Sequence, residues 1–268
     1  MKNKIKEIGY SVFIVIAILL LGLAPTGEKA ALVLNWGDMG IKMAEAGVID
    51  MEKFEVLYAQ RGGLSEADRK MLTAKNNEAL AIDSENSGMM LNMLWAFGLG
   101  NKNSILENGQ MMDPRYGGAG NFASTGGWTL SKGDAMDHYS MHQFLTLTSE
   151  QQELVEKVAK NIYRPCCGNA THFPDCNHGM AMLGLLELMA SQGATEAQMY
   201  KTALEVNTLW FPDTYAAIKT LFASRGVDWS TVDPKEILGA EYSSASGYQK
   251  MLSKMQPQEQ KGGASCGA

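Results

Sequence analysis

The sequence has no surplus of basic charge. Its 268 residues include 23 Lys and Arg against 29 Asp and Glu, which gives a formal net charge of -6. Nucleic-acid-binding domains normally carry basic residues clustered on one face, whereas the Lys and Arg residues here are scattered along the chain. We therefore expect no nucleic acid among the partners.

Several functional signatures are also absent. Neither the G-x-G-x-x-G fingerprint of dinucleotide-binding folds nor the G-x-x-x-x-G-K-[ST] phosphate loop occurs. The C-x-x-C-H pattern that attaches c-type haem is missing as well. These absences argue against nucleotide-dependent and haem-dependent chemistry.

Residues 1–27 differ in composition from the rest of the chain. Three lysines form a basic head and are followed by an apolar run, Tyr10–Ala24, which Pro25 ends. The run is short for a membrane-spanning helix, which needs about 20 residues, and suits the core of a signal peptide. We expect a signal peptide or an N-terminal membrane anchor, with membrane contact through residues 8–24. The remainder then lies on the extracytoplasmic side, unless this segment is a buried helix of the domain.

The pattern of apolar residues beyond residue 27 is helical. Apolar side chains recur at helical spacing in most segments, and no alternating strand pattern is evident. We predict an all-α fold, an irregular multi-helix bundle over residues 28–255. Its central buried helix runs from Cys176 to about Ser191, which is apolar nearly all round except for Glu187.

Two further segments have distinctive compositions. Seven glycines lie in residues 109–133, which predicts a long irregular loop, and long ordered loops often carry function. Residues 256–268 are polar and rich in glycine, which predicts a disordered tail. Cys266 lies in this tail.

The main functional signal is a concentration of cysteine and histidine in the region 134–192. All four histidines and three of the four cysteines fall between residues 138 and 178. Asp175 is a natural N-cap, so Cys176 and His178 should lie in the first turn of the central helix, where the helix dipole favours a thiolate. The candidate metal ligands are Cys166, Cys167, Cys176 and His178.

This set of side chains predicts a four-ligand site for one soft transition-metal ion, copper or zinc, because loop thiols converge there with helix-start ligands. The spacing does not match a standard zinc finger. Three other histidines are further candidate ligands: His138 and His142, which are four apart on a predicted helix, and His172, which is nearer the cysteines.

The cysteine region also resembles a known family. A cysteine pair, an Asp-led helix and the helix-opening string QGATEAQMYKTAL, together covering residues 165–210, are similar to the small three-helix thiol reductases of cytochrome c maturation. The adjacent Cys166 and Cys167 stand where that family has C-x-x-C. This resemblance implies thiol-disulfide exchange by the same cysteines.

Three functions follow as hypotheses. The first is a membrane-associated, extracytoplasmic protein that binds copper or zinc and handles the ion or supports a redox system, with a protein partner receiving metal or electrons. The second is a thiol-disulfide oxidoreductase. The third is a helical scaffold in which disulfides staple the loops, because cysteines outside the cytoplasm usually oxidise.

Overall fold

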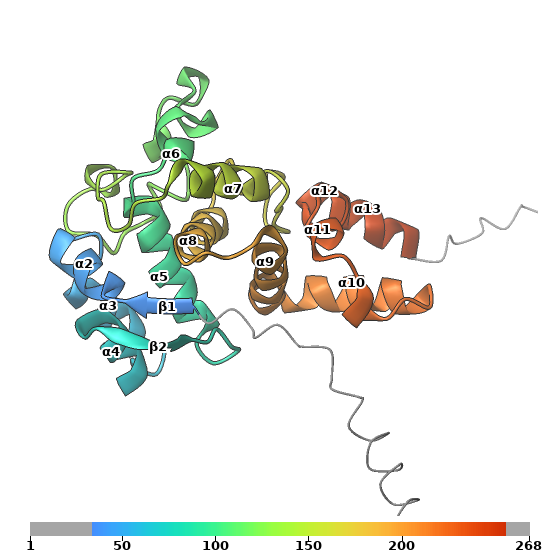
Figure 1. Cartoon of the computed structure of the whole chain (residues 1–268), viewed down its shortest axis with the longest axis horizontal. Helices are drawn as coiled ribbons and strands as arrows, with labels where there is room; N and C mark the ends of the chain where they lie inside the picture. The colour runs from blue at the N-terminus through green and yellow to red at the C-terminus, as the bar shows by residue number, and fades with distance from the viewer. Residues whose placement is uncertain (1–33, 256–268) are drawn as a thin grey trace, which may run out of the picture. The chain divides into compact units, whose positions relative to one another are not determined.

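The computed structural model describes residues 34–255, and within them helices dominate, which confirms the all-α class (Figure 1). The predicted signal or anchor segment, residues 1–27, and the predicted tail, residues 256–268, lie outside the described residues. The α-helices are α2 (Met39–Ala46), α3 (Met51–Ala59), α4 (Glu66–Thr73), α5 (Ser87–Gly100), α6 (Ser104–Asn108), α7 (Ser149–Ala159), α8 (Asn177–Ser191), α9 (Glu196–Trp210), α10 (Pro212–Ser224), α11 (Pro234–Ile237), α12 (Ala240–Ser243) and α13 (Ala245–Met255).

One element departs from the all-helical prediction. Strands β1 (Leu34–Gly37) and β2 (Asn76–Leu80) pair antiparallel, with Leu34 opposite Leu80. Helices α2, α3 and α4 separate the two strands in the chain. Because the partners are distant in sequence and no short turn joins them, the local signals of a hairpin are missing.

The core is built on the packing of α5 against α8, as predicted for a central buried helix. Both helices carry a glycine where they meet. A Cβ atom at Gly98 would lie 2.3 Å from the Met180 carbonyl oxygen, and one at Gly184 would lie 2.5 Å from the Leu94 carbonyl oxygen. The backbones therefore approach too closely for any side chain at these two positions.

The one carboxyl group on α8, Glu187, is fully buried and hydrogen-bonded. The side-chain N–H of Asn101 donates to Glu187 Oε2. The side-chain oxygen Oδ1 of Asn101 accepts the backbone N–H groups of Phe144 and Leu145 at 3.1 Å each. Glu187 thus connects the centre of the core to the end of α5 and to the chain that follows residue 142. Glu187 is therefore a hydrogen-bonded polar group in the core.

Stability should depend on pH through Glu187. Burial raises the pKa of this carboxyl well above its ordinary value, so the folded chain holds a proton that the unfolded chain releases near pH 4.3. The free energy of unfolding therefore falls as pH rises from about 4.3 toward the folded-state pKa, by up to about 1.4 kcal/mol per pH unit. Glu187→Gln keeps the hydrogen-bonding shape but cannot ionise.

We expect urea unfolding to show a flatter pH profile for Glu187→Gln than for the wild type between pH 4.5 and 8. Glu153→Gln, at an exposed position on α7, is the matched control and should leave the wild-type profile unchanged. If the free energy of unfolding changed with pH in the same way in Glu187→Gln and in the wild type, a raised pKa of the Glu187 carboxyl would be contradicted.

The glycine-rich segment does not form the single irregular loop predicted for residues 109–133. It contains three short 3-10 helices, η1 (Gln110–Met112), η2 (Pro114–Tyr116) and η3 (Ala119–Asn121). Trp128 is buried and donates its indole N–H to the Val48 carbonyl oxygen at 2.8 Å. Buried aromatic anchors and consecutive turns order this segment, and its glycines serve as turn residues.

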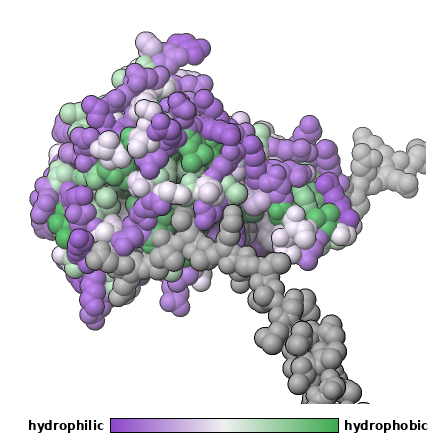
Figure 2. Space-filling model, in the orientation of Figure 1, coloured by the Kyte–Doolittle hydropathy of each residue, from purple (hydrophilic) through white to green (hydrophobic). Residues whose placement is uncertain are grey.

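The surface on the face drawn in Figure 2 is largely hydrophilic, with apolar side chains in scattered patches.

Helices α10 to α13 follow α9, and α9 contacts α10 and α11. Among the helices of residues 34–255, none is long and apolar enough to cross a bilayer.

Candidate metal centre

The three cysteines of the described chain lie on or at the end of one connection between α7 and α8. Backbone hydrogen bonds fix this connection on two sides: Tyr163 N–H donates to the Leu238 carbonyl at 2.8 Å, and Ala245 N–H donates to the Cys167 carbonyl at 2.9 Å. The loop is therefore held by α11 and the start of α13, elements that come about seventy residues later in the chain.

Aromatic rings pack on another part of the same connection. Phe173 lies 5.3 Å from Phe122 and 5.5 Å from Tyr116 between ring centroids. The N–H of Ser124 also donates to the Asp175 carbonyl at 3.2 Å. The glycine-rich segment thus supports the loop that carries the cysteines.

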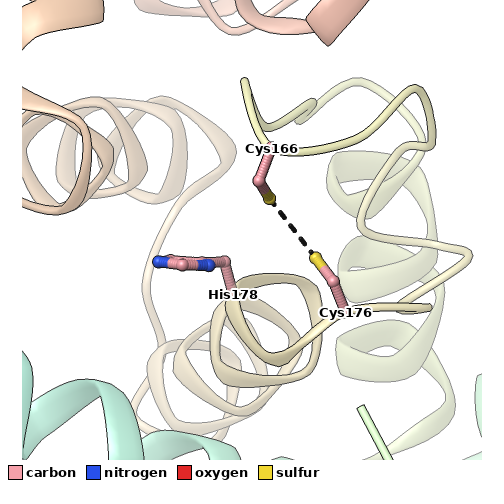
Figure 3. Close-up of side chains that lie close together, drawn as sticks. All are labelled: Cys166, Cys176 and His178. Carbon is pink, nitrogen blue, oxygen red and sulfur yellow. Dashed lines mark hydrogen bonds between the residues drawn. The ribbon is translucent and has the colours of Figure 1, made fainter. Parts of the chain in front are cut away.

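The thiol groups converge on Cys176. Its Sγ lies 3.5 Å from Cys166 Sγ and 3.9 Å from Cys167 Sγ. Figure 3 shows Cys166 reaching from the loop toward Cys176 at the start of α8, with His178 beside them. Tetrahedral zinc thiolates, with Zn–S bonds of about 2.3 Å, place pairs of sulfur atoms about 3.8 Å apart. Both pairs are therefore close to the spacing of ligands on one ion.

His178 offers an imidazole to the same cluster. One of its ring nitrogens, Cys166 Sγ and Cys176 Sγ all lie within 4.8 Å of one another. The ring packs between Phe211 and Trp210, with centroids 4.5 and 5.6 Å away. Burial lowers the pKa of His178, which favours the neutral imidazole that binds metals. Nδ1 is buried and has no protein hydrogen-bond partner.

A second group of three donor atoms shares Cys176 and consists of Cys167, Asp175 and Cys176. Both carboxylate oxygens of Asp175 are already engaged: Oδ1 accepts from Arg164 at 2.8 Å and Oδ2 accepts from Asn169 at 2.9 Å. Asp175 therefore serves the cluster as a support, which leaves the thiols of Cys167 and Cys176 as the donors of this second group.

The predicted role of Asp175 as N-cap is wrong. Cys176 itself is the N-cap residue of α8, with an extended backbone and no side-chain cap, and the Asp175 carboxylate turns to Arg164 and Asn169. A carboxylate beside a fully buried guanidinium gains more from that ion pair than from one backbone N–H. The start of α8 remains at the position that the sequence predicts.

Arg164 supports the cluster through Asp175, although the sequence pattern does not single it out. Its side chain is fully buried, pairs with Asp175, and lies so close to Gly179 that a Cβ there would stand 2.6 Å from Nη2. Nε and Nη1 have no protein partner. The sequence gives one indication of this role, which is that Arg164 directly precedes Pro165, Cys166 and Cys167.

The electrostatics favour a thiolate at Cys176. The thiols of Cys166 and Cys167 can both donate to its sulfur, and they lower the pKa of Cys176. Burial opposes ionisation, whereas the charge of Arg164 and the Gly179 N–H act in the same direction as the two thiols. The thiolate is both the nucleophile and the metal-binding form of cysteine.

The remaining histidines lie outside this cluster. His138 and His142 belong to neither group of donors; they lie close to each other, with His138 Nδ1 3.0 Å from His142 Nε2. The predicted helix through them is wrong, because the 3-10 helix η4 (Ala135–Asp137) ends before His138. His172 is half-buried and joins neither group.

The methionines nearest to the cluster in sequence are core residues. Met180 and Met182 are fully buried on α8. This supports a packing role, which is the commoner use of methionine in a helix that is buried on all sides.

Comparison with protein-family models, with curated proteins and with solved structures gives no match for this chain. The assignment of the cluster therefore rests on its own geometry and chemistry.

Proposed function

We propose that the chain binds one soft transition-metal ion, zinc or copper, through Cys166, Cys167, Cys176 and His178. The observation that carries the proposal is the convergence of two thiols on Cys176 at 3.5 and 3.9 Å beside the partly buried imidazole of His178. Thiolate and imidazole donors suit Zn(II) and Cu(I), and both ions accept tetrahedral sulfur-rich surroundings.

The proposed role is metal handling at a membrane or outside the cytoplasm. The basic head and the apolar run at residues 8–24 support export or anchoring. Cys166 is exposed, whereas Cys167 and Cys176 are partly buried. An exposed thiol ligand can exchange with a ligand of a protein partner, so Cys166 is the proposed point of metal transfer.

The direct test is elemental analysis of the purified full chain with free-thiol counting. We expect about one equivalent of zinc or copper in the wild type and its loss in Cys176→Ser, because Cys176 belongs to both groups of donors. Cys266→Ser is the matched control, since it makes the same change at a cysteine that is not among the proposed ligands and should retain the ion. Metal-free wild-type protein, or retention by Cys176→Ser, would overturn the proposal.

A second candidate function is thiol-disulfide exchange, favoured by the presence of two thiols near one thiolate. The Cys176 thiolate would attack a substrate disulfide and release one substrate thiolate. Cys166 or Cys167 would then attack the mixed disulfide, release the second substrate thiolate and leave an internal disulfide. Metal-free protein with Cys176 bonded to either cysteine would support this function over metal binding.

A further inference from the structure

The histidine pair His138 and His142 forms a second arrangement of donor atoms, separate from the cysteine cluster. His138 Nε2 lies 2.7 Å from the Lys132 carbonyl oxygen, which can only accept a hydrogen bond, so Nε2 carries the proton. In a neutral ring this leaves the lone pair on Nδ1, the atom 3.0 Å from His142 Nε2. Histidines that bind metals commonly hold their other nitrogen in this way.

The two rings are aimed at each other. Their centroids are 5.3 Å apart, about the separation expected when two imidazoles point nitrogens 3.0 Å apart along one line. The His142 ring also stacks on Phe144, with centroids 5.2 Å apart and planes 19° from parallel. The lone pair of His138 Nδ1 therefore faces the N–H of His142 Nε2, and the two nitrogens would be the donors of a bound ion once that proton is displaced.

The turn between the histidines is held in a costly conformation. Ser140 has φ of 55°, and it is the one residue other than glycine with a positive φ among the described residues. Its hydroxyl accepts the Asn103 N–H at 3.0 Å, and its own N–H donates to the Leu99 carbonyl at 2.8 Å. A residue other than glycine keeps a positive φ only where its surroundings hold it in that conformation. Such residues are concentrated at functional sites.

The donor set consists of two neutral imidazoles. No third thiol, carboxylate or imidazole among the described residues completes a group with this pair. Neutral donors leave all of an ion's charge uncompensated, which favours a monovalent ion, and imidazole is a common ligand of copper.

We propose that His138 and His142 form a second metal site for a monovalent ion of the Cu(I) class, bound between His138 Nδ1 and His142 Nε2. Binding replaces the His142 Nε2 proton: that proton moves to Nδ1 of the same ring, so the imidazole stays neutral. With metal–nitrogen bonds of about 2.0 Å, trigonal coordination needs the nitrogens about 3.5 Å apart, an opening of about half an ångström. This site is independent of the cysteine cluster.

Titration with Ag⁺, a redox-stable ion of the same class, tests the proposal. The protein is the full chain with all four cysteines changed to serine, with its fold checked by circular dichroism. We expect the ring ¹⁵N resonances of His138 and His142 to shift together and to saturate at one equivalent. His142→Gln in that chain should weaken binding at least tenfold, whereas His172→Gln, the matched control, should not.

A measurement on the unmodified chain covers the case in which the serine variant does not fold. With Ag⁺ in excess over the four cysteines, the same two histidines should shift, and His142→Gln should remove the shift of His138. Unchanged His138 and His142 resonances under excess Ag⁺ would overturn the proposal and leave a pair that shares only a proton.

Discussion

Gly184→Ala should destabilise the protein by about 3 kcal/mol or more, at or beyond the upper end of overpacking effects. The added Cβ would lie 2.5 Å from the Leu94 carbonyl oxygen and within about 3 Å of the Gly98 backbone. Backbone atoms cannot move aside as the end of a flexible side chain can. The steric overlap can therefore be relieved only by moving α5 away from α8, and the contact between these two helices is the centre of the core.

Chemical unfolding followed by far-UV circular dichroism measures this effect. Gly88→Ala is the matched control, because it makes the same change on α5 where a new Cβ meets nothing within 4 Å. It should be neutral or stabilising by up to about 1 kcal/mol through helix propensity. Equal stabilities for the two variants would contradict the close packing of α5 on α8.

Arg164→Met should be the second severe change. It removes the partner of the Asp175 carboxylate, whose side chain retains 20% exposure beside a fully buried guanidinium. Breaking a fully buried pair costs about 3–5 kcal/mol, and we expect about 2–4 kcal/mol here because Asp175 is partly solvated. The same variant removes positive charge near Cys176 and should weaken metal binding.

A double-mutant cycle with Asp175→Asn separates the ion pair from other effects. The double variant should be less destabilised than the sum of the two single variants by at least about 1 kcal/mol, because the unpaired charge is gone. Additive losses would show that Arg164 acts through packing alone. Metal content, measured on each folded variant, reports the effect on the cluster.

The sequence predicts the helical class, the buried α8 and a Cys/His cluster at its start, because each depends on local spacing. In the structure Cys166, Cys176 and His178 form one group of donors, and Cys167 joins Cys176 in another. It does not reveal the pairing of β1 with β2, whose strands are separated by three helices. It also misassigns Asp175, since the competing partner Arg164 can be identified only once the loop closes. Long-range contacts of this kind leave no periodic signal in a single sequence.

The histidines show the same limit. The spacing of His138 and His142 correctly suggests proximity, but the prediction assigns it to a helix. In the structure it results from a strained turn at Ser140. The glycine-rich segment is likewise ordered by buried aromatic residues, among them Trp128 and Phe173, that lie far apart in sequence.

X-ray absorption spectroscopy of the purified, metal-loaded full chain tests the central claim most directly. The proposed site predicts three sulfur neighbours at about 2.3 Å and one nitrogen neighbour at about 2.0–2.1 Å if the ion is zinc, with one sulfur lost in Cys166→Ser. A first shell of only nitrogen and oxygen, or a spectrum unchanged in Cys166→Ser, would contradict a metal centre at this cluster.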